Sequence, residues 1–137
     1  MNISNDYIYS LYYDRRQREH LPIQYFLQDL QLQISKYRFA KGYSTWLKRE
    51  GLRNIEVSEE QYIEWLAGIY KRPLNNCLVI WNQYKDVIKR TGRSPLSNAT
   101  TVFWIVNQDI EKNKLSRLTG VSTTTIHNHL DSYKQKE

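Results

Sequence analysis

Cysteine is almost absent from this chain of 137 residues, because Cys77 is the only one. One cysteine cannot form a disulfide within the chain, which excludes a small secreted domain held together by disulfides. We therefore expect a protein of the reducing cytoplasm. Cys77 itself is expected on the inner face of a helix as an inert, buried thiol, since no basic neighbour in the sequence would lower its pKa.

Long apolar runs are also lacking. The longest run, Val102–Val106, is far shorter than the roughly 20 residues that a membrane-spanning helix needs. The first residues, Met1–Asp6, contain neither a basic segment nor an apolar one, so we expect no signal peptide. The sequence thus predicts a soluble protein without a membrane partner.

Residue patterns typical of catalysis or metal binding are missing as well. His127 and His129 are two positions apart, so on a helix they point to different sides, and His20 is remote in sequence. No cysteine or histidine cluster has zinc spacing, and no glycine-rich loop could hold a phosphate. The adjacent carboxylates of Glu59 and Glu60 are best explained as first-turn charges that the helix dipole favours. We expect no enzyme, metal or cofactor.

The residues that are abundant are basic and aromatic. The formal net charge is +6, which favours a polyanionic partner without proving one. The chain contains 11 tyrosines and four tryptophans, an unusual number for its length. We interpret them mainly as an aromatic core, and the alternative is that some of them form stacking platforms for nucleic-acid bases.

Apolar residues at three- and four-residue spacing predict helices in the first part of the chain. One is expected over 4–18, ending in a charged cluster that we interpret as a solvated helix end; the alternative is a basic arm that follows a DNA backbone. A second is expected over about 22–39, beginning at Pro22. Its apolar stripe consists of Phe26, Leu27, Leu30, Ile34 and Tyr37.

Glycines and capping residues predict where the next helices begin and end. Gly42 is expected to stop the helix over 22–39, Ser44 to cap a short helix, and Gly51 to end it. Ser58 and Gln61 form a capping box at the start of a helix that Pro73 ends. Asn75 or Asn76 is expected to cap the following helix, whose inner face is predicted to carry Cys77, Ile80, Trp81, Tyr84, Val87 and Ile88.

The segment Thr91–Pro95 combines a helix stop, a glycine and a proline, and it is the strongest boundary signal in the chain. It predicts a helical region over 1–92, suited to dimerisation or partner contacts, and a second unit over 93–137. Ser97 or Asn98 is expected to cap a helix through about Asn107, although the β-branched residues over 100–106 could instead form a strand. The fold class predicted is all-α.

The stretch from Leu115 to Leu130 carries most of the functional inference. Gly120 supplies a tight turn between two short helices, and Ser122 is a good N-cap for the second. Asn113 is expected to cap the first. The apolar positions are spaced to face one small shared core, and they are Leu115, Leu118, Val121, Ile126 and Leu130. Helices over about 98–108, 114–119 and 123–134 would form a three-helix DNA-binding unit.

Polar residues occupy the outer face of the second short helix, near its start. Thr123, Thr124, His127 and Asn128 are our candidates for reading bases, since Asn can pair with adenine, Thr with several bases and His with guanine. Candidates for phosphate contacts flank the motif or could extend its footprint. They are Lys85, Lys89, Arg90, Arg93, Lys112, Lys114, Arg117 and Ser122.

Residues Leu115–Ser122, with Thr125, Ile126 and Leu130, resemble the helix-turn-helix superfamily of bacterial regulators and site-specific recombinase DNA-binding domains. The resemblance covers about 98–134 and implies binding to duplex DNA. Ser116 stands where the pattern usually has Ala, but it is nearly as small. Residues 46–58 show a weaker similarity to the same pattern, so a degenerate second helix-turn-helix remains an alternative.

These observations lead to a sequence-specific duplex DNA-binding protein, expected to act as a homodimer because one recognition helix reads only a few base pairs. It could be a transcriptional regulator or an accessory factor at the origin or relaxosome of a plasmid, phage or conjugative element. Two alternatives remain open. One is a helical protein-interaction module, and the other is a regulatory subunit of a larger nucleic-acid enzyme.

Overall fold

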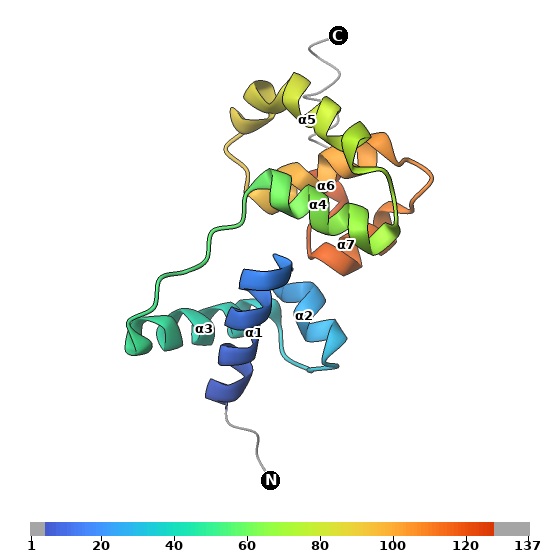
Figure 1. Ribbon diagram of the computed structural model, residues 1–137. Coiled ribbons are helices and arrows are strands. Elements are labelled where there is room, and N and C mark those ends of the chain that lie inside the picture. The colour runs from blue at the N-terminus through green and yellow to red at the C-terminus, as the bar shows by residue number, and fades with distance from the viewer. Residues whose placement is uncertain (1–4, 128–137) are drawn as a thin grey trace. The chain divides into compact units, whose positions relative to one another are not determined.

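The computed structural model describes residues 5–127, and within that range it contains helices and no strand. The prediction of an all-α fold is confirmed, and the strand considered for 100–106 is excluded. Seven helices and a short helical segment over 123–127 follow one another (Figure 1). The helices are α1 (Asn5–Glu19), α2 (Ile23–Asp29), α3 (Lys36–Glu50), α4 (Glu59–Tyr70), α5 (Leu74–Lys89), α6 (Pro95–Val106) and α7 (Lys112–Thr119).

The chain forms two compact units, Met1–Glu56 (unit 1) and Val57–Glu137 (unit 2). This division differs from the boundary that the sequence suggested at Thr91–Pro95. Helix α6 is buried over the whole of 98–104, so it needs neighbours on every side, and α4 and α5 both pack against it. The segment Thr91–Pro95 is therefore a connection inside unit 2.

The two helices that would form the degenerate second helix-turn-helix, α3 and α4, belong to different units. They are joined by a stretch over 52–58 without helix (Figure 1). A helix-turn-helix requires its two helices to share one core. The structure therefore gives no support to a second motif at 46–58.

The core of unit 1 is built from aromatic rings contributed by all three of its helices. Tyr12, Phe26 and Phe39 are almost completely buried. The ring centre of Tyr12 lies 5.0 Å from the ring centre of Phe26 and 5.0 Å from that of Tyr43, a separation typical of tilted and edge-to-face aromatic pairs. For these residues the core interpretation of the aromatic composition is confirmed.

The single helix predicted over 22–39 is wrong. Helix α2 ends at Asp29, Gln31 takes a left-handed conformation with φ 54°, and the side chain of Ser35 caps α3 by accepting from the Arg38 N–H. The apolar stripe does not form one buried face, because Tyr37 is 76% exposed. Helical spacing alone could not distinguish one long helix from two helices that fold back on each other.

Three helix starts lie a few residues earlier than predicted. Pro73, Ser94 and Glu111 hold the N-cap positions of α5, α6 and α7, in place of Asn75 or Asn76, Ser97 or Asn98, and Asn113. Only Ser94 uses its side chain as a cap, accepting from the Ser97 N–H. Two other predictions for helix ends are confirmed: the reciprocal capping box of Ser58 and Gln61 at the start of α4, and the end of α3 at Gly51, which is left-handed with φ 69°.

Gly42 does not end a helix, as predicted, but lies inside α3, and Ser44 does not begin one. A Cβ atom at residue 42 would lie 2.0 Å from Tyr9 Oη and 2.9 Å from Tyr9 Cζ. The ring of Tyr9 in turn packs on Phe39, with ring centres 5.3 Å apart. A larger side chain at this position would therefore have to displace the Tyr9 ring of α1.

Gly42→Ala is expected to destabilise unit 1 by about 1–3 kcal/mol, because overpacking outweighs the roughly 1 kcal/mol that alanine gains in a helix. In a Tyr9→Phe background the loss should shrink, since the hydroxyl that meets the new methyl group is gone. Urea denaturation of the two single variants and the double variant measures this coupling. Equal effects of Gly42→Ala in both backgrounds would contradict the close contact.

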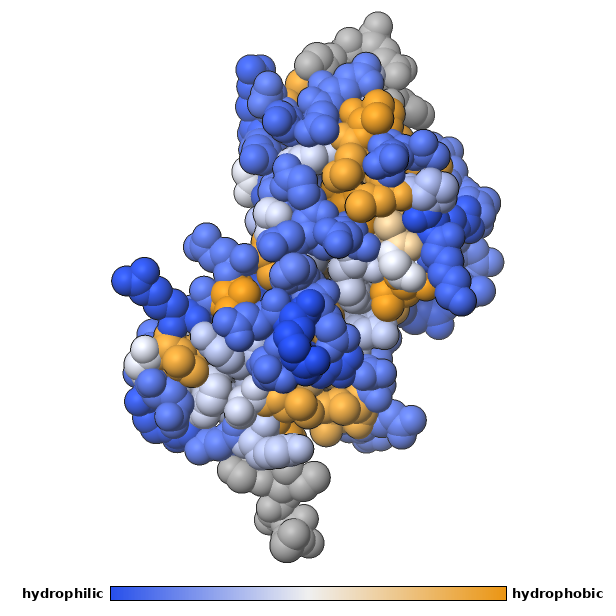
Figure 2. All heavy atoms as spheres, in the orientation of Figure 1, coloured by the Kyte–Doolittle hydropathy of each residue, from blue (hydrophilic) through white to orange (hydrophobic). Residues whose placement is uncertain are grey.

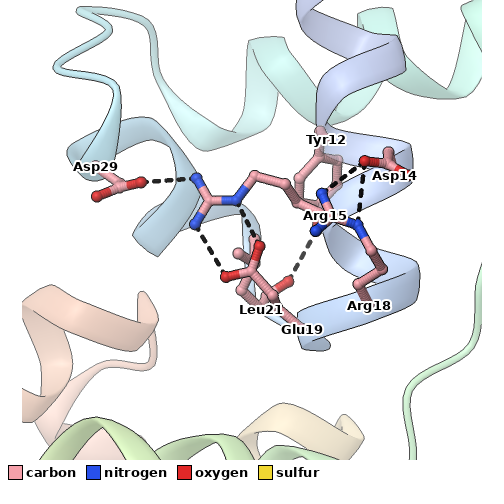
Figure 3. Close-up of polar contacts among 7 residues, drawn as sticks. All are labelled: Tyr12, Asp14, Arg15, Arg18, Glu19, Leu21 and Asp29. Carbon is pink, nitrogen blue, oxygen red and sulfur yellow. Dashed lines mark hydrogen bonds and ion pairs between the residues drawn. The ribbon is translucent and has the colours of Figure 1, made fainter.

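The basic cluster at the end of α1 is bound within unit 1 (Figure 3). Arg15 contacts Glu19 at 2.8 Å and Asp29 at 2.7 Å, and Arg18 contacts Asp14 at 2.6 Å. Arg16 donates to the backbone oxygen of Ile55 and to Tyr12 Oη. These partners are an argument against the basic-arm alternative for 15–18.

Two carboxylates of α4 form hydrogen bonds within unit 2. Glu59 is buried and accepts from Asn98 Nδ2 at 3.2 Å, and Glu60 accepts from the indole N–H of Trp81 at 2.7 Å. Burial raises the pKa of the Glu60 carboxyl, but this indole bond, a backbone hydrogen bond and the charge of Lys89 outweigh it and hold the pKa below its usual value. These bonds attach α4 to α5 and α6.

On the face drawn in Figure 2, hydrophilic residues predominate and apolar ones form separate groups. No helix within 5–127 has the length and apolar character required to cross a membrane.

Candidate nucleic-acid interface

The turn after α7 is closed by hydrogen bonds around Gly120. Gly120 is left-handed with φ 82°, and its N–H donates to the Ser116 oxygen at 2.8 Å. Thr119 Oγ1 donates to the Leu115 oxygen and accepts from the Val121 N–H at 3.1 Å. A left-handed residue of this kind is where glycine costs least, so the predicted role of Gly120 is confirmed.

Ser122 begins the segment that follows. Its Oγ accepts from the Thr125 N–H at 3.1 Å, and its backbone oxygen accepts from the Ile126 N–H at 3.1 Å. Ser122 is therefore the N-cap of the helical segment over 123–127, as predicted. Asn128, His129 and Leu130 lie outside the described residues.

Inner and outer faces separate as the spacing predicted. Leu115 and Ile126 are completely buried and Val121 nearly so, while Leu118 is half-buried. Among the base-reading candidates, Thr124 and His127 are exposed and Thr123 is half-buried. The first turn of the segment thus presents short polar side chains to solvent while its apolar side chain enters the core of unit 2.

The α7 residues predicted to contact phosphates differ in the exposure and the contacts of their charged ends. Lys114 and Arg117 are exposed, and Arg117 Nε lies 3.4 Å from the Asn113 oxygen of its own helix. Lys112 is half-buried, with its ammonium nitrogen 4.9 Å from the ring centre of Trp104, a cation–π contact. Ser122 is exposed beside them at the start of the next segment.

The remaining phosphate candidates lie on α5 or just after it. Lys89 and Arg90 are exposed, Lys85 is half-buried, and the Lys89 ammonium lies 5.7 Å from the Trp81 ring centre. Arg93 is the one that a hydrogen bond joins to the segment over 123–127, since its Nη1 donates to the Thr125 oxygen at 2.9 Å. Part of its hydrogen-bonding capacity is therefore already used within unit 2.

Acidic residues are missing from two long stretches of unit 2. No Asp or Glu occurs from Val87 to Gln108 or from Lys112 to His127. Asp109 and the exposed Glu111 lie between the two stretches; Asp109 is paired with Arg72 at 2.6 Å, and this contact lowers the pKa of the Asp109 carboxyl. Along the chain, few carboxylates therefore accompany the cations of these stretches, a composition that favours an anionic ligand.

Sequence reasoning missed three contacts that position this region. They are the bond from Arg93 to Thr125, the closure of the turn by the Thr119 hydroxyl, and the packing of Lys112 on Trp104. The Thr119 contact had a local signal, because threonine commonly bonds to nearby backbone. The bond from Arg93 joins residues 32 positions apart, and Lys112 and Trp104 lie on two successive helices, so no helical spacing rule indicates either contact.

Within the described residues, no group of three or more His, Cys, Asp or Glu side chains is close enough together to hold a metal ion. No protein-family model matches the chain, and no curated protein matches it. The case for a function therefore depends on the residues and their geometry.

Proposed function

We propose that this protein binds double-stranded DNA in a sequence-dependent way, and that residues 112–127 act as a helix-turn-helix. In that motif the first helix crosses the phosphate backbone and the start of the second enters the major groove. Helix α7 would take the first role and the segment from Ser122 the second. We propose a biological role as a transcriptional regulator or as an accessory factor of a plasmid, phage or conjugative element.

The observation that carries this proposal is the combination of a closed glycine turn with an exposed polar first turn. Thr124 and His127 are exposed where base edges would lie, directly after a turn that buries Val121. Lys114 and Arg117 are exposed on the helix before the turn, in a stretch without carboxylates. Contacts between these cations and the phosphate backbone of DNA would position the motif, and the short polar residues would recognise the base sequence.

A homodimer is part of the proposal, since one such segment reads only a few base pairs. A role in protein interaction is the second candidate. It is favoured by three apolar or aromatic side chains that are unusually exposed: Tyr7 and Tyr37 in unit 1, at 62% and 76%, and Val79 in unit 2, at 63%. These residues could serve a partner of the DNA-bound protein equally well.

Thr124→Ala and Lys114→Gln should have different effects on DNA binding. After selection of a preferred site from a random duplex library, Thr124→Ala should relax the preference at one or two positions, each worth about 1–3 kcal/mol. Lys114→Gln should weaken all sequences alike. Asn128→Ala and His127→Ala are expected to behave like Thr124→Ala. Fluorescence anisotropy with matched and mismatched duplexes measures both effects.

Two outcomes would count against the proposal at different levels. Uniform weakening by Thr124→Ala, His127→Ala and Lys114→Gln would contradict the assignment of base-reading residues. No binding of any duplex at low salt would contradict DNA binding itself, and the protein-interaction candidate would then be preferred.

A further inference from the structure

Unit 1 contains an open groove between α1 and α3, with a volume of about 540 Å³. Its floor includes Tyr9 and Trp46, and its rim carries Arg38, Lys41 and Arg49. Arg38, Lys41, Thr45 and Arg49 follow one another at three- and four-residue spacing, so they lie along one face of α3. All four are exposed. The α3 wall of the groove therefore carries Arg38 and Lys41 toward one end and Arg49 toward the other.

The cations of this wall differ from those of α1 in their partners. Arg15, Arg16 and Arg18 each bond to groups within unit 1. Arg49 is paired with Asp6 across the groove at 2.7 Å, which ties the end of α3 to the start of α1. For the charged ends of Arg38 and Lys41, in contrast, the described part of the chain provides no hydrogen bond or ion pair. Two positive charges at the rim are thus left for a ligand.

We propose that this groove binds the phosphate backbone of DNA and gives the protein a second contact with its duplex, one that is independent of base sequence. The inference rests on the proposed function, because it takes the DNA bound by unit 2 as the ligand. Two neighbouring unpaired cations on one helix face match successive phosphates of one strand, and the exposed Thr45 hydroxyl can donate to the same backbone. Trp46 is only 7% exposed, which leaves little ring face for a stacked base and favours contact with the DNA backbone.

The contact also has a consequence for affinity. Residues 52–58 join the two units without a helix of their own, so binding by one unit raises the concentration of the other near the same duplex. Even a weak contact in unit 1 then strengthens the binding of the whole chain. Unit 2 would select the site, and unit 1 would add affinity at any sequence.

The test is a comparison of two double variants of the full-length protein. Arg38→Gln/Lys41→Gln removes both unpaired groove cations. Lys48→Gln/Arg53→Gln removes the same charge from α3 and the following stretch, outside the groove. Binding of a fluorescent mixed-sequence duplex and of the preferred site is measured by anisotropy across a range of salt concentrations. Urea denaturation verifies that each variant is folded.

The groove variant should bind every duplex roughly 10- to 100-fold more weakly at 0.1 M salt, and its slope of log K against log salt should fall by about 2. The control variant should keep the slope of the original protein. In the original protein, DNA should protect Lys41, but not Lys48, from amine acylation. Equal slopes for the two variants, in a protein that does bind DNA, would overturn this inference alone. Failure of the original protein to bind any duplex would overturn it together with the proposed function.

Discussion

Raising the salt concentration from about 50 to about 200 mM is expected to weaken binding of mixed-sequence duplex DNA by roughly 10²- to 10⁴-fold. Each phosphate that a Lys or Arg side chain neutralises releases condensed counterions, and the slope of log K against log salt is about −0.9 per contact. Both figures are calculated for unit 2 alone, which has seven cationic candidates for such contacts; the two groove cations of unit 1 would add to the loss. The 10⁴-fold loss of affinity is expected if all seven cations contact phosphates.

The lower figure excludes three cations of unit 2 whose charged ends lie over an indole ring or donate to a different helical segment, and it keeps Arg117, whose hydrogen bond is to its own helix. Lys89 and Lys112 lie over indole rings, and Arg93 donates to the Thr125 oxygen. Anisotropy titrations at five or more salt concentrations measure the slope. As a control, Lys114→Gln/Arg117→Gln should lower the slope by about 2. A slope close to zero for the original protein would mean that electrostatic contact with DNA is absent.

Ile126→Ala is expected to reduce the free energy of unfolding of unit 2 by about 2–5 kcal/mol. Ile126 is completely buried and lies in the short helical segment that Ser122 caps. Truncation leaves a cavity where the segment enters the core, so the segment should detach and DNA binding should be lost with it. Guanidinium denaturation followed by tryptophan fluorescence measures the stability, and anisotropy measures the binding.

Thr124→Ala is the matched control for this prediction, because Thr124 is two positions away and exposed. It should change stability by no more than about 0.5 kcal/mol while altering sequence preference. The two variants therefore separate loss of structure from loss of base reading. A cost below about 1 kcal/mol for Ile126→Ala would mean that the segment contributes little to the core.

Local signals in the sequence predicted several features of the structure correctly. The capping box at Ser58, the left-handed glycines at 51 and 120 and the cap at Ser122 each depend on neighbouring backbone groups, and all are present. The burial of Leu115, Val121 and Ile126 also agrees with their spacing. Such features depend on a few adjacent residues, which is why sequence reasoning reaches them.

The features that sequence reasoning missed depend on contacts between distant residues. Gly42 was interpreted as a helix stop, but its absent side chain makes room for Tyr9 of another helix. The boundary at Thr91–Pro95 resembled a domain junction, yet α6 needs α4 and α5 to cover its apolar surface. The groove of unit 1 likewise combines residues from the start of α1 with residues of α3. None of these relations has a signal at short range.

Because Cys77 is the only cysteine, the reactivity of its thiol can measure how often the core of unit 2 opens. Cys77 is completely buried, burial raises the pKa of its thiol, and only a weaker hydrogen bond from Asn107 acts in the other direction. A reagent in solution can reach this sulfur only when the helices around it separate. The rate at which the unmodified protein reacts with a thiol reagent therefore reports the opening equilibrium of unit 2, with no engineered label and no second thiol to confuse the signal.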